Sequence, residues 1–177
     1  MAASLSLNHW FGGGFVVPGL DMLLNNEMDD FTIQPGAANV FQLVGAGANE
    51  IAPGKRMLSS MTPAFLESPR GVAVLGTPGG SRIISMVLIA ALAWLDGADA
   101  RTMAALPRYH HQYLPDHVLY EPEAFTEEDI AALEARGHLL QVSSRLYGNM
   151  AIVAWDYEAN EVEAATDPRA EMPAWIY

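Results

Sequence analysis

The chain has 177 residues, of which 51% are hydrophobic and only 17% are charged, so it holds enough apolar material for a core and too little charge for a disordered chain. Its formal net charge is −12, and an acidic surface repels phosphate backbones, which excludes nucleic acid as a partner. The absence of cysteine excludes disulfides, thiolate zinc sites and cysteine nucleophiles. An average domain is about 25% charged, so we expect a partner to cover part of the surface.

The first third of the chain is rich in residues that favour turns. Ser4–Leu7 alternates polar and apolar residues and predicts a strand, while the glycines and proline of Asn8–Gly19 predict a flexible loop. Leu23–Phe31 predicts an acidic turn, and Ile33–Arg56 predicts a long irregular loop. Loops of that length in compact domains are usually functional.

The rest of the chain mixes strands and helices. The pattern predicts a strand pair over Met61–Leu66 and Gly71–Gly76, joined by a turn. Helices and further strands follow in chain order: helices at Ser81–Leu95, at Ala100–Leu106 and at Thr126–Arg136 with Thr126 as N-cap, then strands at His138–Ser143, Met150–Asp156 and Glu161–Ala165. No regular βαβ alternation appears, which favours a layered α+β fold in one domain over residues 1–177.

The segment Leu23–Phe31, LLNNEMDDF, carries two amides and three carboxylates between apolar residues. Three carboxylates suit a cation, either a metal ion or the ammonium group of a substrate. Neither the EF-hand spacing nor the H-E-x-x-H pattern occurs in the sequence. An ammonium ligand therefore fits Asp30 and its neighbours better than a metal, and a self-capping acidic loop is the alternative.

Thr77–Arg82, TPGGSR, follows a predicted strand and opens a predicted helix. Gly79 and Gly80 let the backbone approach a ligand closely, and N–H groups near a helix start favour anions. The segment predicts an oxyanion hole, with Ser81 as the helix cap, or else a tight strand-to-helix turn.

Two weaker signals lie elsewhere in the chain. Ser59 and Ser60 are adjacent hydroxyls that could donate to a carboxylate, although adjacent serines are most often surface capping residues. His110 and His111 are neighbours whose side chains tend to point apart, so they predict a packed or hydrogen-bonded turn rather than a ligand pair.

Six motifs in one order resemble the small subunit of the gamma-glutamyltransferases (gamma-glutamyl transpeptidases), members of the N-terminal nucleophile hydrolase superfamily. The resemblance extends from about Ser4 to Tyr177 and rests on these segments: Asn8 with Phe11–Gly12, LLNNEMDDF, KRMLSSM-T-P, TPGGSRI, Pro107–Gln112 and Asp167–Arg169.

The resemblance implies a stacked αββα fold with two antiparallel sheets between helical layers. It also implies an enzyme without cofactor or metal, in which an N-terminal threonine attacks the gamma-glutamyl amide and passes the acyl group to water, an amino acid or a peptide. A large subunit from the same precursor is the implied partner, and a periplasmic or secreted location is typical of the family.

The resemblance also implies a role for each matching residue. Asn8, Glu27 and Asp30 are expected to bind the substrate α-amino group, and Ser59 and Ser60 are expected to donate to its α-carboxylate. The remaining implied residues belong to the reaction itself, with Gly79 and Gly80 as the oxyanion hole and Ser6 as a residue that positions the nucleophile.

Two departures from the family pattern stand out. Phe41 occupies the position of a lid tyrosine in some bacterial members, so the site is expected to be more open. Only seven residues precede Asn8, and the family's T-x-H-x-x-V-x-D run is absent. We therefore expect a truncated small subunit with an acyl-binding site and no nucleophile, inactive and prone to self-association by itself.

Three functions remain open at this stage. The first is gamma-glutamyl transfer or hydrolysis together with the large subunit. The second is a non-catalytic module that binds glutamate or a gamma-glutamyl group. The third keeps the fold and changes the substrate, as in acylases that act on glutaryl side chains of beta-lactams or in relatives that process poly-gamma-glutamate.

Overall fold

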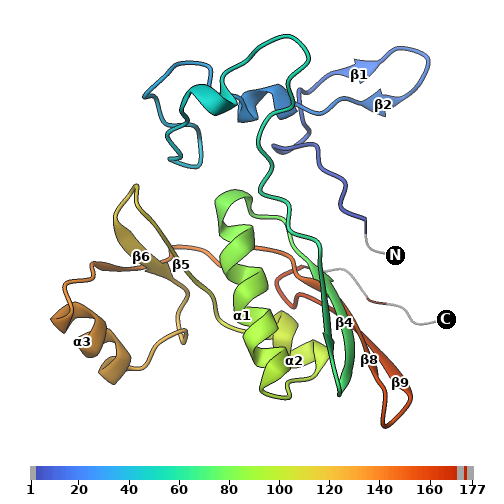
Figure 1. Cartoon of the computed structure of the whole chain (residues 1–177), viewed down its shortest axis with the longest axis vertical. Coiled ribbons are helices and arrows are strands. Elements are labelled where there is room, and N and C mark those ends of the chain that lie inside the picture. Colours follow the sequence, from blue (N-terminus) through green and yellow to red (C-terminus); the bar gives the residue numbers. More distant parts are fainter. Residues whose placement is uncertain (1–2, 171–173, 175–177) are drawn as a thin grey trace. The chain divides into compact units, whose positions relative to one another are not determined.

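The computed structural model describes residues 3–170 and residue 174. Within them the chain forms two compact units, residues 3–59 and the residues from Ser60 onward, and each unit is described by itself. The single-domain organisation that we expected from the length stays a prediction. Figure 1 shows the helices and strands of both units.

The unit of residues 3–59 is built mostly from turns. Strands β1 (Val16–Val17) and β2 (Met22–Leu23) pair antiparallel, and the 3₁₀ helices η1 (Glu27–Asp30) and η2 (Gly47–Asn49) follow. The hairpin lies partly within the predicted loop, and the strand predicted at Ser4–Leu7 is wrong, because those residues pair with no strand. The long irregular loop predicted over Ile33–Arg56 is confirmed apart from η2.

The second unit is organised around a four-stranded antiparallel sheet in the order β3-β4-β8-β9. The predicted strand pair is confirmed, although β3 begins three residues later than expected. The strands span Ala64–Ser68 (β3), Gly71–Gly76 (β4), Ala151–Asp156 (β8) and Glu161–Thr166 (β9). Gly71 opens β4 with a φ of 156°, and a side chain there would meet the carbonyl oxygen of Trp155 at 2.0 Å, so the sheet requires glycine at this position.

Helices α1 (Ile83–Leu95) and α2 (Ala100–Ala105) pack on one face of this sheet (Figure 1). Asp99 caps α2 by accepting from the N–H of Thr102 at 2.6 Å. The core of the unit forms between helices and sheet, and its buried apolar side chains include Leu75, Met86, Trp94, Met103, Met150 and Ile152. Side chains on the opposite face of the sheet are exposed, with Phe65 at 58%, Val153 at 48% and Trp155 at 43%.

A smaller sheet lies beside α1. Strands β5 (Tyr109–Gln112) and β6 (His117–Tyr120) pair antiparallel, and β7 (Leu140–Val142) joins β6 in parallel after helix α3 (Glu127–Ala135). Thr126 caps α3 as predicted, in a reciprocal capping box with Asp129. His110 and His111 lie in β5, so the turn predicted for them is wrong, and alternation along the strand places their side chains on opposite faces.

The observed elements make a mixed α+β protein with three sheets. Among the described residues, no helix is long and apolar enough to cross a membrane. The same residues contain no group of three or more histidines and carboxylates that could hold a metal ion.

Candidate functional site

Two asparagines organise the acidic segment Leu23–Phe31. Asn25 Oδ1 accepts from the N–H of Glu27 at 3.1 Å, which starts η1. Asn26 Nδ2 donates to Asp29 Oδ2 at 2.7 Å. Asp29 therefore stabilises the turn by accepting a hydrogen bond within the segment, which agrees with the self-capping alternative for this one carboxylate.

The loop that carries Asn8 is tied to the same asparagine. Asn8 has a left-handed φ of 67°, and its N–H donates to Ser6 Oγ at 2.8 Å. Its side-chain Nδ2 donates to the carbonyl oxygen of Asn26 at 3.2 Å, while Asn26 Oδ1 accepts from the N–H of His9 at 3.0 Å. These bonds hold Ser6 and Asn8 against the acidic segment, although they lie well apart from it in sequence.

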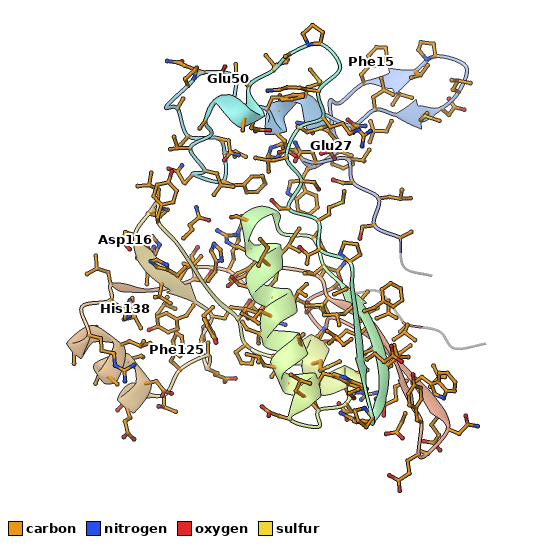
Figure 2. The ribbon with its side chains drawn as sticks, in the orientation of Figure 1. Phe15, Glu27, Glu50, Asp116, Phe125 and His138 are labelled. Carbon is orange, nitrogen blue, oxygen red and sulfur yellow. The ribbon has the colours of Figure 1, made fainter. Side chains whose placement is uncertain are left out.

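Asp30 stands at the centre of this cluster. Burial raises its pKa to about 6, and a hydrogen bond and the charge of Glu27 act in the same direction, whereas His9 and a hydrogen bond from Asn8 lower it. The structure thus brings together four residues predicted for the site: Ser6, Asn8, Glu27 and Asp30. The side chain of Glu27 is labelled in Figure 2.

Asn49 connects this cluster to the serine segment. Its Nδ2 donates to the carbonyl oxygen of Asp30 at 2.7 Å, and its Oδ1 accepts from the N–H of Leu58 at 2.9 Å, one residue before Ser59. Lys55 Nζ donates to the carbonyl oxygens at the end of η2, including that of Glu50 at 3.1 Å. Asn49 could not be predicted from the sequence, because nothing local distinguishes it from other amides of a long loop.

The glycine turn belongs to the second unit. Gly79 and Gly80 have φ values of 150° and 59°, and a Cβ on Gly79 would lie 2.6 Å from Met86 Cε. Within residues 3–170, the N–H groups of Gly79 and Gly80 donate to no backbone or side-chain acceptor. They are therefore available to an anion at the start of the helical segment η3 (Gly80–Arg82), which continues into α1.

Ser81 does not cap the helix as the sequence predicted. Neither η3 nor α1 has a side-chain cap, and Ser81 Oγ instead donates to Gln112 Oε1 at 2.8 Å. Ser60 begins this unit, and its carbonyl oxygen accepts from Thr62 Oγ1 at 3.0 Å.

A buried network of charges joins two of the sequence motifs. Arg108 pairs with Asp167, and Arg169 donates to Asp167 Oδ1 at 3.0 Å and to Glu121 Oε2 at 2.6 Å. Although burial alone would raise the pKa of Asp167, hydrogen bonds from Arg108, Arg169 and the N–H of Met150 lower it below its usual value.

Glu121 completes the network, although no sequence motif marks it. It is fully buried and also accepts from the N–H groups of Arg108 and Tyr147, at 3.1 and 3.0 Å. Glu121 and Asp167 accept from the N–H groups of Tyr147 and Met150 and so fix the segment that leads into β8. Within this segment the N–H of Asn149 donates to Thr77 Oγ1 at 3.1 Å.

The two parts offer complementary chemistry. The cluster around Asp30 offers negative charge and amide groups to a cation, and the glycine turn offers two N–H groups to an anion. Fold and site together define an α+β protein with one candidate cation-binding cluster and one candidate anion-binding turn.

Comparison with known proteins identifies the particular family. The family model described as "Gamma-glutamyltranspeptidase" matches residues 1–177, and the chain belongs to this family. It is 38% identical over 172 residues to the glutathione hydrolase proenzyme of Escherichia coli (strain K12), and 42% identical over 168 residues to that of Pseudomonas aeruginosa. These alignments cover 96% and 93% of the chain but only 29% and 30% of the two relatives, so the chain spans about 30% of their length.

Solved structures agree with this assignment. The gamma-glutamyltranspeptidase from Pseudomonas nitroreducens complexed with L-DON matches 99% of this chain and 92% of its own chain, with 38% identity and a TM-score of 0.85. The resemblance found in the sequence is therefore confirmed at the level of the family.

Proposed function

We propose that the chain supplies the acyl-binding groups and the oxyanion donors for gamma-glutamyl acyl transfer or hydrolysis. One observation carries the proposal most: Asn8, Glu27 and Asp30 meet in one cluster, although Asn8 is distant from the two carboxylates in sequence. Such a cluster is suited to an α-ammonium group, because an ionised carboxylate forms a charge-assisted pair with it.

The remaining roles follow from the chemistry of the substrate. Ser59 and Ser60 donate to its α-carboxylate, and Ser6 positions the attacking group. A threonine hydroxyl attacks the gamma-carbonyl and forms an ester as the amine leaves with a proton. The N–H groups of Gly79 and Gly80 stabilise the oxyanion that develops in this step and in the transfer of the acyl group to water or an amine. We assign the threonine to no residue of this chain.

We further propose that a large subunit covers the open face of the sheet β3-β4-β8-β9, completing an αββα sandwich. The register supports this arrangement, because Phe65 pairs with Val74 and Val74 pairs with Val153, which places these apolar side chains on one face. The helices α1 and α2 already cover the other face. An apolar sheet face of this kind is normally buried against a second layer.

The test is turnover of a gamma-glutamyl anilide by the complete enzyme with the proposed large subunit. Asp30→Asn should lower kcat/KM by about 10- to 100-fold, the usual cost of a lost charged hydrogen bond. Asp29→Asn is the matched control, because its amide oxygen can still accept from Asn26, and its kcat/KM should stay within about twofold of wild type. Equal losses in both variants would contradict the proposal.

The same experiment separates the binding-module function. A complete protein that binds L-glutamate in calorimetry, loses this binding in Asp30→Asn and turns over no gamma-glutamyl anilide would be a glutamate-binding relative. Both the enzyme and the glutamate-binding relative would bind the ammonium group at Asp30, and its raised pKa does not distinguish them. Turnover is therefore the deciding observation.

A further inference from the structure

A chain of side-chain hydrogen bonds connects the glycine turn to strand β5. Ser81 Oγ lies 2.8 Å from Gln112 Oε1, and the same amide oxygen lies 2.9 Å from His110 Nε2. The other ring nitrogen, His110 Nδ1, lies 2.7 Å from Ser85 Oγ in the first turn of α1. The four side chains thus link the start of the helical segment to β5 at two points.

The positions of the protons follow from the donors and acceptors. An amide oxygen only accepts, so the Ser81 hydroxyl and the His110 Nε2–H both donate to Gln112. The Gln112 amide group is held in this orientation, because its Nε2 donates to the carbonyl oxygen of Leu114. In a neutral imidazole with its proton on Nε2, the other nitrogen accepts, and Ser85 must therefore donate to His110 Nδ1.

The surroundings of His110 favour this neutral form. Its side chain is buried, and burial lowers its pKa below the usual value. The charges of Arg82 and His111 act in the same direction, and only the hydrogen bond with Gln112 opposes them. At neutral pH the chain of hydrogen bonds is therefore expected to hold one fixed tautomer.

The turn has a specific need for such support. Gly79 and Gly80 adopt left-handed φ values, and glycine leaves the backbone more freedom than any other residue. Neither η3 nor α1 is fixed by a side-chain cap. The hydroxyl of Ser81, the residue predicted to cap the helix, donates to Gln112 Oε1 instead.

We propose that Gln112 and His110 are positioning residues for the glycine turn, which hold Ser81 and thereby aim the N–H groups of Gly79 and Gly80 at the developing oxyanion. This inference rests on the proposed function for its catalytic consequence. Oxyanion donors contribute only when they are oriented before the reaction, so loosening the turn should affect the transition state more than substrate binding.

The first test uses Gln112→Met in the complete enzyme, which keeps the length of the side chain and removes the amide. We expect kcat for a gamma-glutamyl anilide to fall by about tenfold or more, with KM unchanged within about twofold. The matched control is His111→Gln, the adjacent exposed residue of β5 that pairs with Asp116 at 2.9 Å, which should change neither constant. An unchanged kcat in Gln112→Met overturns the inference.

The second test does not depend on turnover. Hydrogen exchange of the peptide 77–85, followed by mass spectrometry in the complete enzyme, should be faster in Gln112→Met than in wild type and unchanged in His111→Gln. Equal exchange in Gln112→Met and wild type overturns the inference. Faster exchange together with an inactive wild-type enzyme would refute the proposed function and leave the positioning role standing.

A third variant covers the case in which Gln112→Met fails to fold. Gln112→Glu keeps an oxygen that accepts from Ser81 and His110 and adds a negative charge beside the imidazole, so the His110 pKa should rise. Nitrogen-15 NMR should show the proton on Nε2 in the neutral wild-type ring. A proton on Nδ1, or a His110 pKa that does not rise in Gln112→Glu, overturns the inference.

Discussion

The pKa of Asp30 gives a quantitative prediction for ligand binding. Burial and the neighbouring Glu27 raise this pKa to about 6, so about nine-tenths of the carboxyl groups are ionised at pH 7 and about one-tenth at pH 5. An α-ammonium ligand pairs with the ionised form. The affinity of the complete enzyme for L-glutamate should therefore fall about tenfold between these two pH values, because the ionised fraction of Asp30 falls by about that factor.

The same pKa also fixes the sign of a stability effect. The pKa of Asp30 in the folded state lies above the ordinary aspartate value of 3.8, so the folded state binds more protons than the unfolded state between about pH 4 and pH 6. The contribution of Asp30 to stability is present below pH 4 and is lost as the pH rises through 6. Asp30→Asn should remove this slope from the free energy of unfolding.

Calorimetry of L-glutamate binding at several pH values measures the predicted effect, with glutarate as the matched ligand that lacks the ammonium group. Glutarate affinity should lack this tenfold loss, and Asp30→Asn should bind L-glutamate weakly at every pH. Carbon-13 NMR of the Asp30 carboxyl group gives its pKa directly. A titration near pH 4, or a glutamate affinity that is flat between pH 5 and pH 7, refutes the reasoning.

Three further outcomes follow from the fold. Glu121→Gln should lower the free energy of unfolding, measured by urea denaturation, by about 3 kcal/mol, because it weakens the buried ion pair with Arg169. The control Glu134→Gln, on the exposed surface of α3, should change this free energy by less than about 0.5 kcal/mol. Gly71→Ala should cost more stability than Gly97→Ala in thermal unfolding, because both have positive φ values but only the first forces a contact, with the backbone carbonyl oxygen of Trp155; equal costs would contradict this. The chain expressed alone should self-associate in sizing chromatography at micromolar concentration, because its sheet has an open apolar face, and a monodisperse monomer would contradict this.

Elements with strong local signals could be predicted from the sequence. The capping box of Thr126 and Asp129 needs only residues three apart, and the core strand Gly71–Gly76 is bounded by turn residues on both sides. The strand predicted at Ser4–Leu7 failed because alternation over four residues carries no information about a pairing partner. The strands β1 and β2 could not be predicted, because each has only two residues and therefore shows no periodic pattern.

The candidate site divides in the same way. The carboxylates of Leu23–Phe31 lie close together in sequence, and the two glycines of the turn are adjacent. The chemistry of each group could therefore be predicted. The supporting residues could not, because Asn49 and Gln112 act over 19 and 31 residues respectively. The predicted cap at Ser81 failed because a distant amide competes for its hydroxyl, and no local rule includes such a partner.

The central claim is that the cluster of Asn8, Glu27 and Asp30 recognises the α-ammonium group of a gamma-glutamyl substrate. The most direct measurement compares kcat/KM of the complete enzyme for a gamma-glutamyl anilide and for a glutaryl anilide, which differ only by that amino group. The account predicts that the gamma-glutamyl compound is preferred by about 100-fold or more at pH 7, and that Asp30→Asn removes most of this preference. Equal turnover of the two anilides by the wild-type enzyme, as expected of a glutaryl acylase, would contradict it.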